Sequence, residues 1–161
     1  MTSLTDTLCL QCGLCCNGVL FADVRREGDD SSPLFLQHGK RVAQPCPAFD
    51  SSDCKCALYT ERPVRCRKFE CKQLIAVRAE KISAAAALKQ IRAAKKLAAR
   101  VNVLLAELGD DKIDLPLSKR FQRLQRTAER GGLPSEQFDT LAELQLAVHQ
   151  LTLLLAQEFY A

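Results

Sequence analysis

The sequence predicts a mainly α protein, in which an irregular, cysteine-rich module over residues 1–71 packs on a helical bundle formed by residues 72–161. Two observations predict this division. All nine cysteines lie before residue 72, in a half of the chain with few periodic apolar runs. The second half has no cysteine, and its apolar residues recur mostly every three or four positions, as on one face of a helix. Because 161 residues is the size of one domain, the two parts are expected to form a single compact unit.

The first long helix is expected from Lys72 to Leu108. This segment has neither proline nor glycine and is rich in alanine, the best helix former. Gly109 follows it in the position of a C-terminal cap. Because such a helix is long for a globular protein, a break near Ser83 is also expected.

Two further helices are expected nearer the C-terminus. One runs from Leu117 to Arg130 and is ended by two glycines. The other begins at Ser135, whose side chain is predicted to act as N-cap, and carries an apolar stripe. The stripe consists of Phe138, Leu141, Leu144, Val148, Leu151, Leu155 and Phe159. Burial of these helices against one another gives a bundle, and a dimer interface is the alternative use of the last stripe.

The first half is expected to be largely irregular. Val19 to Val24 predicts a short strand, and the composition of Arg25 to Ser32 predicts a solvated loop. Ser32 and Pro33 predict the start of a short helix that reaches Leu36. With so little regular structure, this half must draw much of its stability from something other than apolar packing.

The cysteines indicate what that source is. Four of them lie within eight residues near the N-terminus, and the other five follow by residue 71. They are Cys9, Cys12, Cys15, Cys16, Cys46, Cys54, Cys56, Cys66 and Cys71. Gaps of two residues let the side chains of a tight turn converge on one ion, and thiolate is the ligand that soft metals prefer. The spacing therefore predicts metal binding.

A disulfide framework is the competing interpretation, and it requires an oxidising compartment. The N-terminus, MTSLTDT, has neither a basic region nor an apolar region of a secretory signal. No stretch of about 18 apolar residues is present that would span a bilayer. We therefore expect a cytoplasmic protein without a membrane anchor, in which the thiols stay reduced and serve as metal ligands.

The complete pattern resembles a known family. After CxxCxxCC come Pro45-Cys46-Pro47, then Cys56-Ala57-Leu58-Tyr59 and the string RPVRCRKFEC that ends at Cys71. This arrangement resembles the CxxCxxCC cysteine-cluster family, also called the YkgJ family, of bacterial zinc- or iron-chelating domains. Relatives that methylate lysines of flagellin carry the same cluster and are linked to an iron–sulfur centre. This chain is shorter than those methylases, and no S-adenosylmethionine site is evident in it.

The resemblance implies a set of site residues. The family cysteines fall on Cys9, Cys12, Cys15, Cys16, Cys46, Cys56, Cys66 and Cys71. Cys54 has no counterpart, so it is expected to be spare. The resemblance also places an arginine at Arg62 and at Arg67, where a positive charge would offset the negative charge of a thiolate-bound metal centre. Lys55, Arg65 and Lys68 lie among the same cysteines and are the other candidates for this role.

The identity of the metal stays open at this point. Eight thiolates can hold two tetrahedral zinc ions, or one 4Fe-4S cluster and a second metal. Cys9, Cys12 and Cys15 followed by Cys46-Pro47 follow the bacterial ferredoxin pattern with its last interval stretched, which favours a 4Fe-4S cluster. The pairs Cys54/Cys56 and Cys66/Cys71 are more typical of zinc. The sequence favours iron–sulfur over zinc, and a nine-thiolate cluster that shares several zinc ions is a further alternative.

Two hypotheses for function follow. In the first, an iron–sulfur centre serves electron transfer or the modification of a partner protein. In the second, zinc fixes the fold of an adaptor or interaction module that has no catalytic role. No catalytic residue is predicted, because His38 and His149 each lack a second ligand or a nucleophile at a suitable spacing.

The partner is expected to be a protein. Residues 72–107 hold eight Lys or Arg and two Asp or Glu, so the excess positive charge of the chain lies there. The basic face of this helix consists of Lys81, Lys89, Arg92, Lys95, Lys96 and Arg100. It is the place where a nucleic acid would bind, but the segment has no aromatic residue that could stack on bases. The sequence makes no prediction of the oligomeric state.

Overall fold

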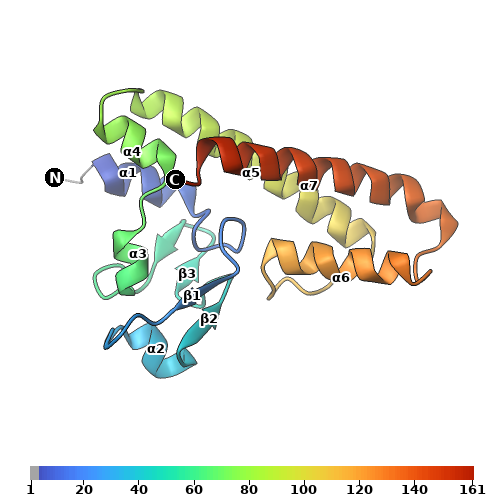
Figure 1. The fold of residues 1–161 in the computed structure, drawn as a ribbon, viewed down its shortest axis with the longest axis horizontal. Coiled ribbons are helices and arrows are strands. Elements are labelled where there is room, and N and C mark those ends of the chain that lie inside the picture. Colours follow the sequence, from blue (N-terminus) through green and yellow to red (C-terminus); the bar gives the residue numbers. More distant parts are fainter. Residues whose placement is uncertain (1–3) are drawn as a thin grey trace.

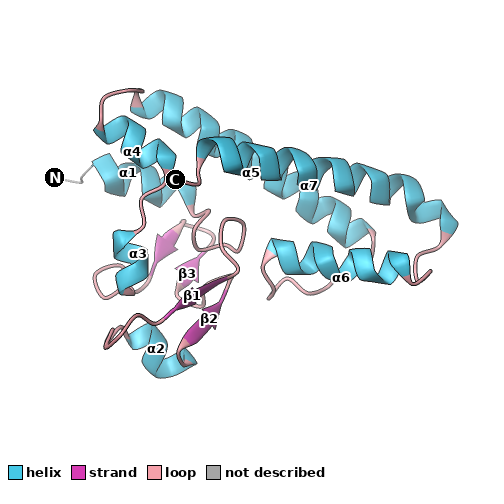
Figure 2. Ribbon diagram, in the orientation of Figure 1, coloured by secondary structure: helices cyan, strands magenta, loops and turns pink. Residues whose placement is uncertain are grey.

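Three long helices, α5 (Ala84–Glu107), α6 (Leu117–Glu129) and α7 (Phe138–Glu158), form one end and the centre of the molecule (Figure 1). The computed structural model describes residues 4–161, and in it α5 and α7 lie side by side along most of their length. Apart from a 3-10 turn between α6 and α7, the remaining elements form a smaller module at the other end of these helices, and all the strands lie in its lower part (Figure 2). The predicted mainly α fold with a helical C-terminal region is therefore confirmed.

The predicted helix from Lys72 to Leu108 is divided into two. The first helix, α4, covers Lys72–Arg78 and ends where Glu80 takes a left-handed conformation with φ of 55°. The second, α5, begins after Ser83, whose Oγ accepts a hydrogen bond from the amide of Ala86 at 3.1 Å. The predicted break at Ser83 is confirmed, because an N-cap serine satisfies an amide that has no partner within the helix.

Glycines end α5 and α6 as predicted. Gly109 has φ of 85°, and its amide donates to the carbonyl of Ala106, while the amide of Asp110 donates to that of Leu105. These two bonds form a Schellman motif, which favours glycine because of the left-handed backbone. Gly131 ends α6 in the same conformation, with φ of 72°.

The predicted N-cap of the last helix is wrong. Ser135 begins a 3-10 turn, η1 (Ser135–Gln137), whose N-cap residue is Pro134, and the N-cap residue of the following α-helix is Gln137. The amide of Gln137 donates to the carbonyl of Pro134, so Ser135 already lies inside a turn. The α-helix begins at Phe138, which is 54% exposed, so the first residue of the predicted stripe lies outside the core.

The other residues of that stripe pack in the main core. This core joins buried residues of α5, α6 and α7 to Leu8 of α1 (Leu4–Cys12) and to the loop residues Leu14 and Leu20. It includes Leu144, Ala147, Leu151 and Leu155 of α7 and Phe159 at the end of that helix, with Leu141 and Val148 partly buried beside them. The predicted burial of the stripe within the chain is thus observed, and the helical part and the start of the chain share one apolar core.

Short elements make up the module. Strands β1 (Asp23–Arg25) and β2 (Arg41–Ala43) form an antiparallel pair, as do β3 (Phe49–Asp50) and β4 (Lys55–Cys56). Helix α2 (Pro33–His38) begins where predicted and extends two residues past Leu36, and α3 (Val64–Lys68) follows β4. A second, small core of four buried residues holds β1, α2 and β2 together. Its members are Val24, Leu34, Phe35 and Val42.

Two local predictions for this module need correction. The strand begins at Asp23 rather than Val19, because turn bonds occupy the earlier backbone: the amide of Val19 donates to the side chain of Asn17, and that of Leu20 to the carbonyl of Leu14. The predicted solvated loop also contains a buried residue, Asp30, which is 6% exposed. A carboxylate is buried only where hydrogen bonds satisfy it, and the bonds of Asp30 are described below.

The C-terminal end of α7 is attached to the module. The amide of Lys72 donates to the carbonyl of Phe159 at 3.1 Å, and the amide nitrogen of the Gln73 side chain donates to the carbonyl of Glu158 at 2.9 Å. The hydroxyl of Tyr160 donates to the carbonyl of Leu20 at 2.8 Å. These bonds place the end of the chain beside α1 and α4 (Figure 1).

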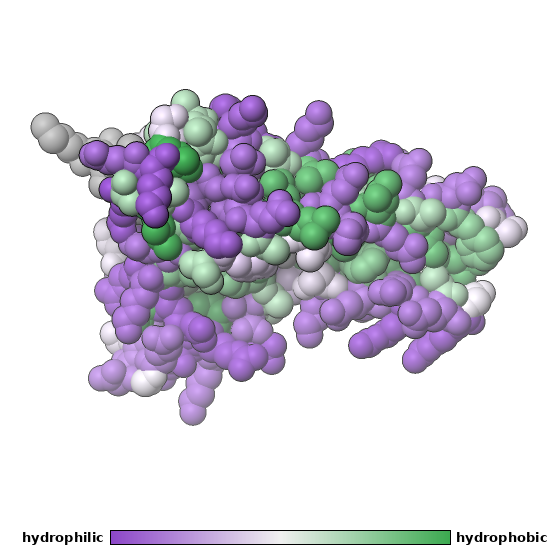
Figure 3. All heavy atoms as spheres, turned by 45° about the horizontal axis from the view of Figure 1, so that its top comes forward, coloured by the Kyte–Doolittle hydropathy of each residue, from purple (hydrophilic) through white to green (hydrophobic). Residues whose placement is uncertain are grey.

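The surface is mixed in character. Hydrophobic residues lie over α5 and α7, interrupted by hydrophilic ones, and hydrophilic residues dominate the rest of the visible face (Figure 3). The exposed large apolar residues of these two helices are Val103, Phe138, Leu146 and Leu153. Between residues 4 and 161, none of the helices combines the length and the apolar composition needed to cross a membrane.

Candidate metal centre

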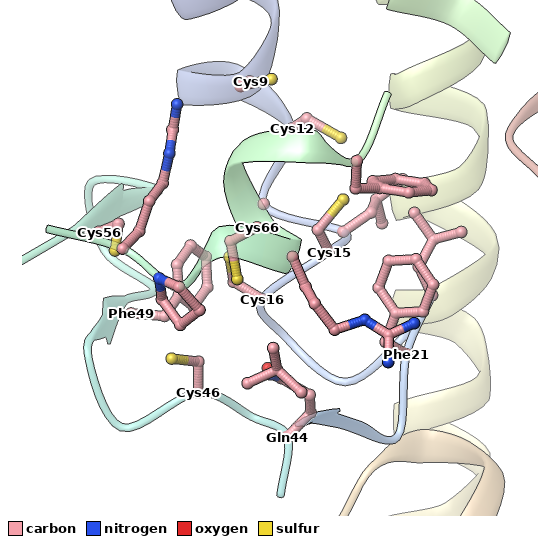
Figure 4. Close-up of a pocket in the computed structure, with 18 of the residues that line it drawn as sticks. Cys9, Cys12, Cys15, Cys16, Phe21, Gln44, Cys46, Phe49, Cys56 and Cys66 are labelled. Atoms are coloured by element: carbon pink, nitrogen blue, oxygen red, sulfur yellow. The ribbon is translucent and has the colours of Figure 1, made fainter. Parts of the chain in front are cut away.

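A cavity of about 760 Å³ lies between α1, the strands and the segment from α3 to α4. All nine cysteines line it, including the eight that the sequence predicts as ligands. Figure 4 shows the cysteine side chains distributed around this cavity, with Cys9, Cys12 and Cys15 on one side and Cys46 and Cys56 on the other. The fold therefore brings the sequence-predicted ligands to one place.

Helix α1 positions the first two cysteines. Cys9 and Cys12 lie one turn apart on this helix, rather than in the predicted tight turn, so their side chains share a face. The helix ends at Gly13, which has φ of 69°. A Cβ at Gly13 would lie 2.7 Å from Cζ of Phe49, so only glycine fits between α1 and the β3–β4 hairpin.

The turn after α1 carries the next two cysteines. The amide of Cys16 donates to the carbonyl of Gly13 at 3.0 Å, which closes the turn. The carbonyl of Cys16 then accepts a hydrogen bond from the amide of Cys46 at 2.8 Å. The peptide bond between Gln44 and Pro45, just before Cys46, is cis. These contacts join the N-terminal cysteine motif to the loop that contains Cys46.

The remaining family cysteines come from β4, α3 and the start of α4. Cys56 pairs with Phe49 across the β3–β4 hairpin, and Cys66 lies on α3. Cys71 is the N-cap residue of α4 and packs against the main core. Cys71 therefore connects the cavity to α4, whose first residues bond to the C-terminal end of α7.

Asp30 holds α3 in place. One of its carboxylate oxygens accepts a hydrogen bond from the amide of Val64 at 2.7 Å, and the other accepts from the amide of Ser32 at 3.0 Å. The hydroxyl of Ser32 donates to the carbonyl of Glu61 at 2.7 Å. A buried carboxylate that accepts backbone amides fixes the start of a helix, and this helix carries Cys66.

Burial and mutual repulsion act on the thiols of α1 and its turn. Burial, together with the charges of Cys71 and Cys9, raises the pKa of Cys12 from 9.0 to about 12, although the backbone at Leu14 and the cation of Lys95 oppose the rise. Burial also raises the pKa of Cys15 well above 9.0, and the charges of Cys12, Cys16, Cys71 and Cys9 add to this effect. Cys9, Cys12, Cys15 and Cys71 are thus electrostatic neighbours.

A second group of thiols shows the same behaviour. Burial is the main reason that the pKa of Cys16 rises to about 12. The negative charges of Cys46, Cys66 and Cys56 add to the rise, and the charge of Cys12 makes a smaller contribution. Burial and the charges of Cys46 and Cys56 raise the pKa of Cys66 to about 11, against the opposing charge of Arg62. The pKa of Cys46 is raised by burial, with a contribution from Cys56.

The donor set fits a soft metal ion. The pKa values of Cys12, Cys15, Cys16, Cys46 and Cys66 are raised, and a cation among these thiols would stabilise them as thiolates. Over residues 4–161, no three histidine, cysteine or carboxylate side chains converge closely enough to hold an ion as they stand. Ligation therefore requires the cysteine side chains on the walls of the cavity to rotate. Rotation about χ1 from one staggered rotamer to another moves the sulfur by about 3 Å.

The two predicted arginines are placed differently. Arg62 lines the cavity, and its guanidinium lies over the ring of Tyr59, 3.9 Å from the ring centre. Arg67 is exposed on α3, and the residues that line the cavity do not include it. Arg65 and Lys68 do line the cavity, and both pair with Glu27. Lys55 is exposed and pairs with Asp53.

Three buried polar atoms near the cysteines have no hydrogen-bond partner in the described chain. They are Nε of Arg62 and the side-chain oxygens of Gln44 and Gln73, and all three residues line the cavity. Orphaned polar atoms are costly, so their position on this wall indicates a polar or charged occupant. Neither glutamine belongs to a recognisable sequence motif, so the sequence did not predict them as site residues.

Cys54 lies apart from these interactions. Its sulfur is 3.6 Å from the Nζ of Lys95, which also donates to the carbonyl of Gln11 at 3.2 Å. Lys95 therefore contacts the module and is not part of an open basic face, and Arg100 is engaged by Glu143 on α7. The predicted basic face thus loses two of its cations to contacts within the chain.

Comparison with known proteins gives one match. The model of the CxxCxxCC family, described as "Putative zinc- or iron-chelating domain", matches residues 8–88, a range that contains all nine cysteines of the cavity and the start of α5. Neither the curated proteins nor the solved structures include a significant match. The family match spans half of the chain and contains every cysteine of the cavity, so this chain belongs to the CxxCxxCC family of zinc- or iron-chelating domains.

Proposed function

We propose that this chain is a cytoplasmic metal-binding protein that holds iron as a 4Fe-4S centre on the cysteines of its module. A 4Fe-4S cluster takes four thiolates, so the eight candidate ligands would serve this cluster and a second metal. They are Cys9, Cys12, Cys15, Cys16, Cys46, Cys56, Cys66 and Cys71. The observation that carries the proposal is that these eight thiols, which come from separate elements, all line one cavity. A cavity lined with soft sulfur donors suits iron or zinc far better than a hard cation such as Mg²⁺ or Ca²⁺.

Two features favour an iron–sulfur centre over bare zinc. Cys9, Cys12 and Cys15 keep the two-residue spacing of the bacterial ferredoxin run. The buried Nε–H of Arg62 lacks a partner, and the charge of Arg62 opposes the rise that burial causes in the pKa of Cys66. Hydrogen bonds to the sulfur atoms are one of the means by which proteins tune an iron–sulfur cluster, and Arg62 is placed to supply one.

Such a centre would serve electron transfer or the modification of a partner protein. Both uses need a partner to approach the metal, and Cys9 and Cys66 are exposed at the edge of the cavity. Arg65 and Lys68 lie on the same rim, where they would favour an acidic protein surface.

A structural zinc module is the second candidate, and the size of the module's elements favours it. The strands have only two or three residues and the small core has four buried members, which is little for independent stability. Zinc on four thiolates would stabilise such a fold directly. The chain would then act as an interaction adaptor without catalysis.

The metal itself distinguishes the two candidates. The protein is made in iron-replete cells and purified without oxygen, and iron, zinc and acid-labile sulfide are measured per chain together with the visible spectrum. We expect a brown protein that contains sulfide and bleaches with dithionite, because zinc has no accessible redox change. A colourless, sulfide-free protein filled with zinc would overturn the redox proposal and support the adaptor. A protein that binds neither metal would overturn both.

A further inference from the structure

We infer that the eight family cysteines form two separate four-thiolate centres, which we call the helix-side set and the strand-side set. The helix-side set is Cys9, Cys12, Cys15 and Cys71, and the strand-side set is Cys16, Cys46, Cys56 and Cys66. This inference rests on the proposed metal binding and adds to it which thiols share a metal. Cys54 belongs to neither set.

Packing separates the two sets. Cys12, Cys15 and Cys71 pack against the main helical core, together with Leu8 and Leu74. Cys46 packs instead against the small core of β1, α2 and β2. The two cores are distinct, so the cavity has a wall of helices on one side and a wall of strands and loops on the other.

Backbone contacts assign the strand-side members to one another. The amide of Cys46 donates to the carbonyl of Cys16, and the amide of Phe49 donates to the carbonyl of Cys46. Phe49 is the cross-strand partner of Cys56. Cys66 lies on α3, which contacts β1 and so borders the small core.

The helix-side members are joined through α1 and the start of α4. Cys9 and Cys12 share one face of α1, and Cys15 follows in the turn. Cys71 is the N-cap residue of α4 and packs with Cys12 and Cys15 against the main core, although more than fifty residues separate it from them in the sequence. The fourth member of this set is therefore Cys71 and not Cys46, which the stretched ferredoxin pattern had suggested.

The consecutive pair Cys15 and Cys16 marks the boundary. Cys15 packs with Cys12 against the main core, whereas the carbonyl of Cys16 accepts the amide of Cys46, which packs against the small core. Neighbouring residues in a turn can direct their side chains to opposite sides. Cys15 would therefore bind the metal of the helix-side set, and Cys16 that of the strand-side set. In ferredoxins with two clusters, the cysteine before proline likewise ligates the other cluster, as Cys46-Pro47 does here.

Cysteine-to-serine variants test this division when metal and sulfide are measured in protein prepared without oxygen. We expect Cys15→Ser and Cys16→Ser each to retain about half of the wild-type metal, because each removes a ligand from one of two centres. Cys15→Ser with Cys71→Ser should lose no more than Cys15→Ser alone. Cys15→Ser with Cys46→Ser should lose nearly all the metal, and the control Cys54→Ser should lose none.

The opposite result for the two double variants, or loss of metal from Cys54→Ser, would overturn the inference. A wild-type protein without metal would instead count against the proposed function. Circular dichroism identifies any variant that does not fold.

A second experiment on the wild-type holoprotein tests the same division without substitutions. The holoprotein is treated with a chelator, samples are alkylated over time, and the modification of each cysteine is followed by mass spectrometry.

We expect the four cysteines of each set to become reactive together, with a different time course for each set, and Cys54 to react before metal is lost. One common time course for all eight, or groups divided in another way, would overturn the two-centre inference.

Discussion

The amide of Cys46 donates a hydrogen bond to the carbonyl of Cys16 across 2.8 Å, and this contact connects the turn after α1 to the strand-side wall of the cavity. The backbone of a turn held in this way has little freedom to move. Its geometry begins at Gly13, whose carbonyl accepts the amide of Cys16 and whose left-handed backbone ends α1. Gly13 therefore determines where both consecutive cysteines lie.

Gly13→Ala should destabilise the protein and reduce its metal content. The left-handed conformation costs an L-residue about 1–2 kcal/mol, and the added Cβ would lie 2.7 Å from the ring of Phe49. Gly28→Ala is the matched control, because Gly28 also has positive φ, at 52°, but a Cβ there meets nothing within 4 Å. Urea unfolding should show the larger loss for Gly13→Ala, and equal losses would show that contact with Phe49 is unimportant.

Asp30→Ala should weaken the strand-side set without a change of ligand. The substitution leaves the amides of Val64 and Ser32 buried without their acceptor, at a cost of about 1–3 kcal/mol for an unsatisfied group. Because Val64 begins α3, the position of Cys66 should become less defined. The measurement is metal content together with the urea midpoint, and Asp29→Ala, at an exposed neighbouring position, is the control. The prediction fails if the two variants behave alike.

Arg120→Met should destabilise the helical part. Arg120 is a buried cation whose Nε donates to Asp110 at 2.6 Å and whose terminal nitrogen donates to Asn102 at 2.5 Å. Removing one partner of a buried ion pair leaves the other charge uncompensated, at a cost of about 3–5 kcal/mol. Arg123→Met, at an exposed position on the same helix, should have little effect on the urea midpoint. Similar midpoints for both variants would contradict this prediction.

The sequence predicts regular structure well where one apolar period continues for several turns. The break at Ser83, the caps at Gly109 and Gly131 and the start of α2 are all local features that a few neighbouring residues determine. The sequence could not place Cys71 beside the cysteines of α1, because the position of Cys71 depends on how α4 packs against the main core. The spacing of the N-terminal run suggested Cys46 instead, since sequence spacing carries no information on packing across the fold.

Polar residues were the other failure of sequence reasoning. Asp30 lies in a segment whose composition is typical of an exposed loop, and only the distant amide of Val64 explains its burial. Ser135 has the residue type of an N-cap, but the preceding proline starts a 3-10 turn first. In both cases a partner outside the local pattern decided the outcome.

Removal of the metal should loosen the module more than the helices. The module has strands of two or three residues and a small core, whereas α5 and α7 pack along most of their length in the main core. Amide hydrogen exchange across residues 9–71 should therefore accelerate in metal-free protein, while exchange in α5 and α7 changes little. Native protection across residues 9–71 without metal would contradict the link between metal and fold.

Alkaline pH should destabilise the metal-free protein and leave the metal-bound protein nearly unchanged. Burial raises the pKa of Cys12 and of Cys16 from 9.0 to about 12, and that of Cys66 to about 11. The folded state thus binds these protons more tightly than the unfolded state does. The resulting stability is present below about pH 9 and is lost as pH rises towards 12.

A bound metal removes this dependence, because its thiolate ligands have already lost their protons. Urea midpoints measured by circular dichroism at pH 8.0 and 10.5 should fall for metal-free protein and stay close for the metal-bound form. Parallel changes in both forms would mean that other groups cause the alkaline loss. In that case, deprotonation of the buried thiols would not be the cause of the lost stability.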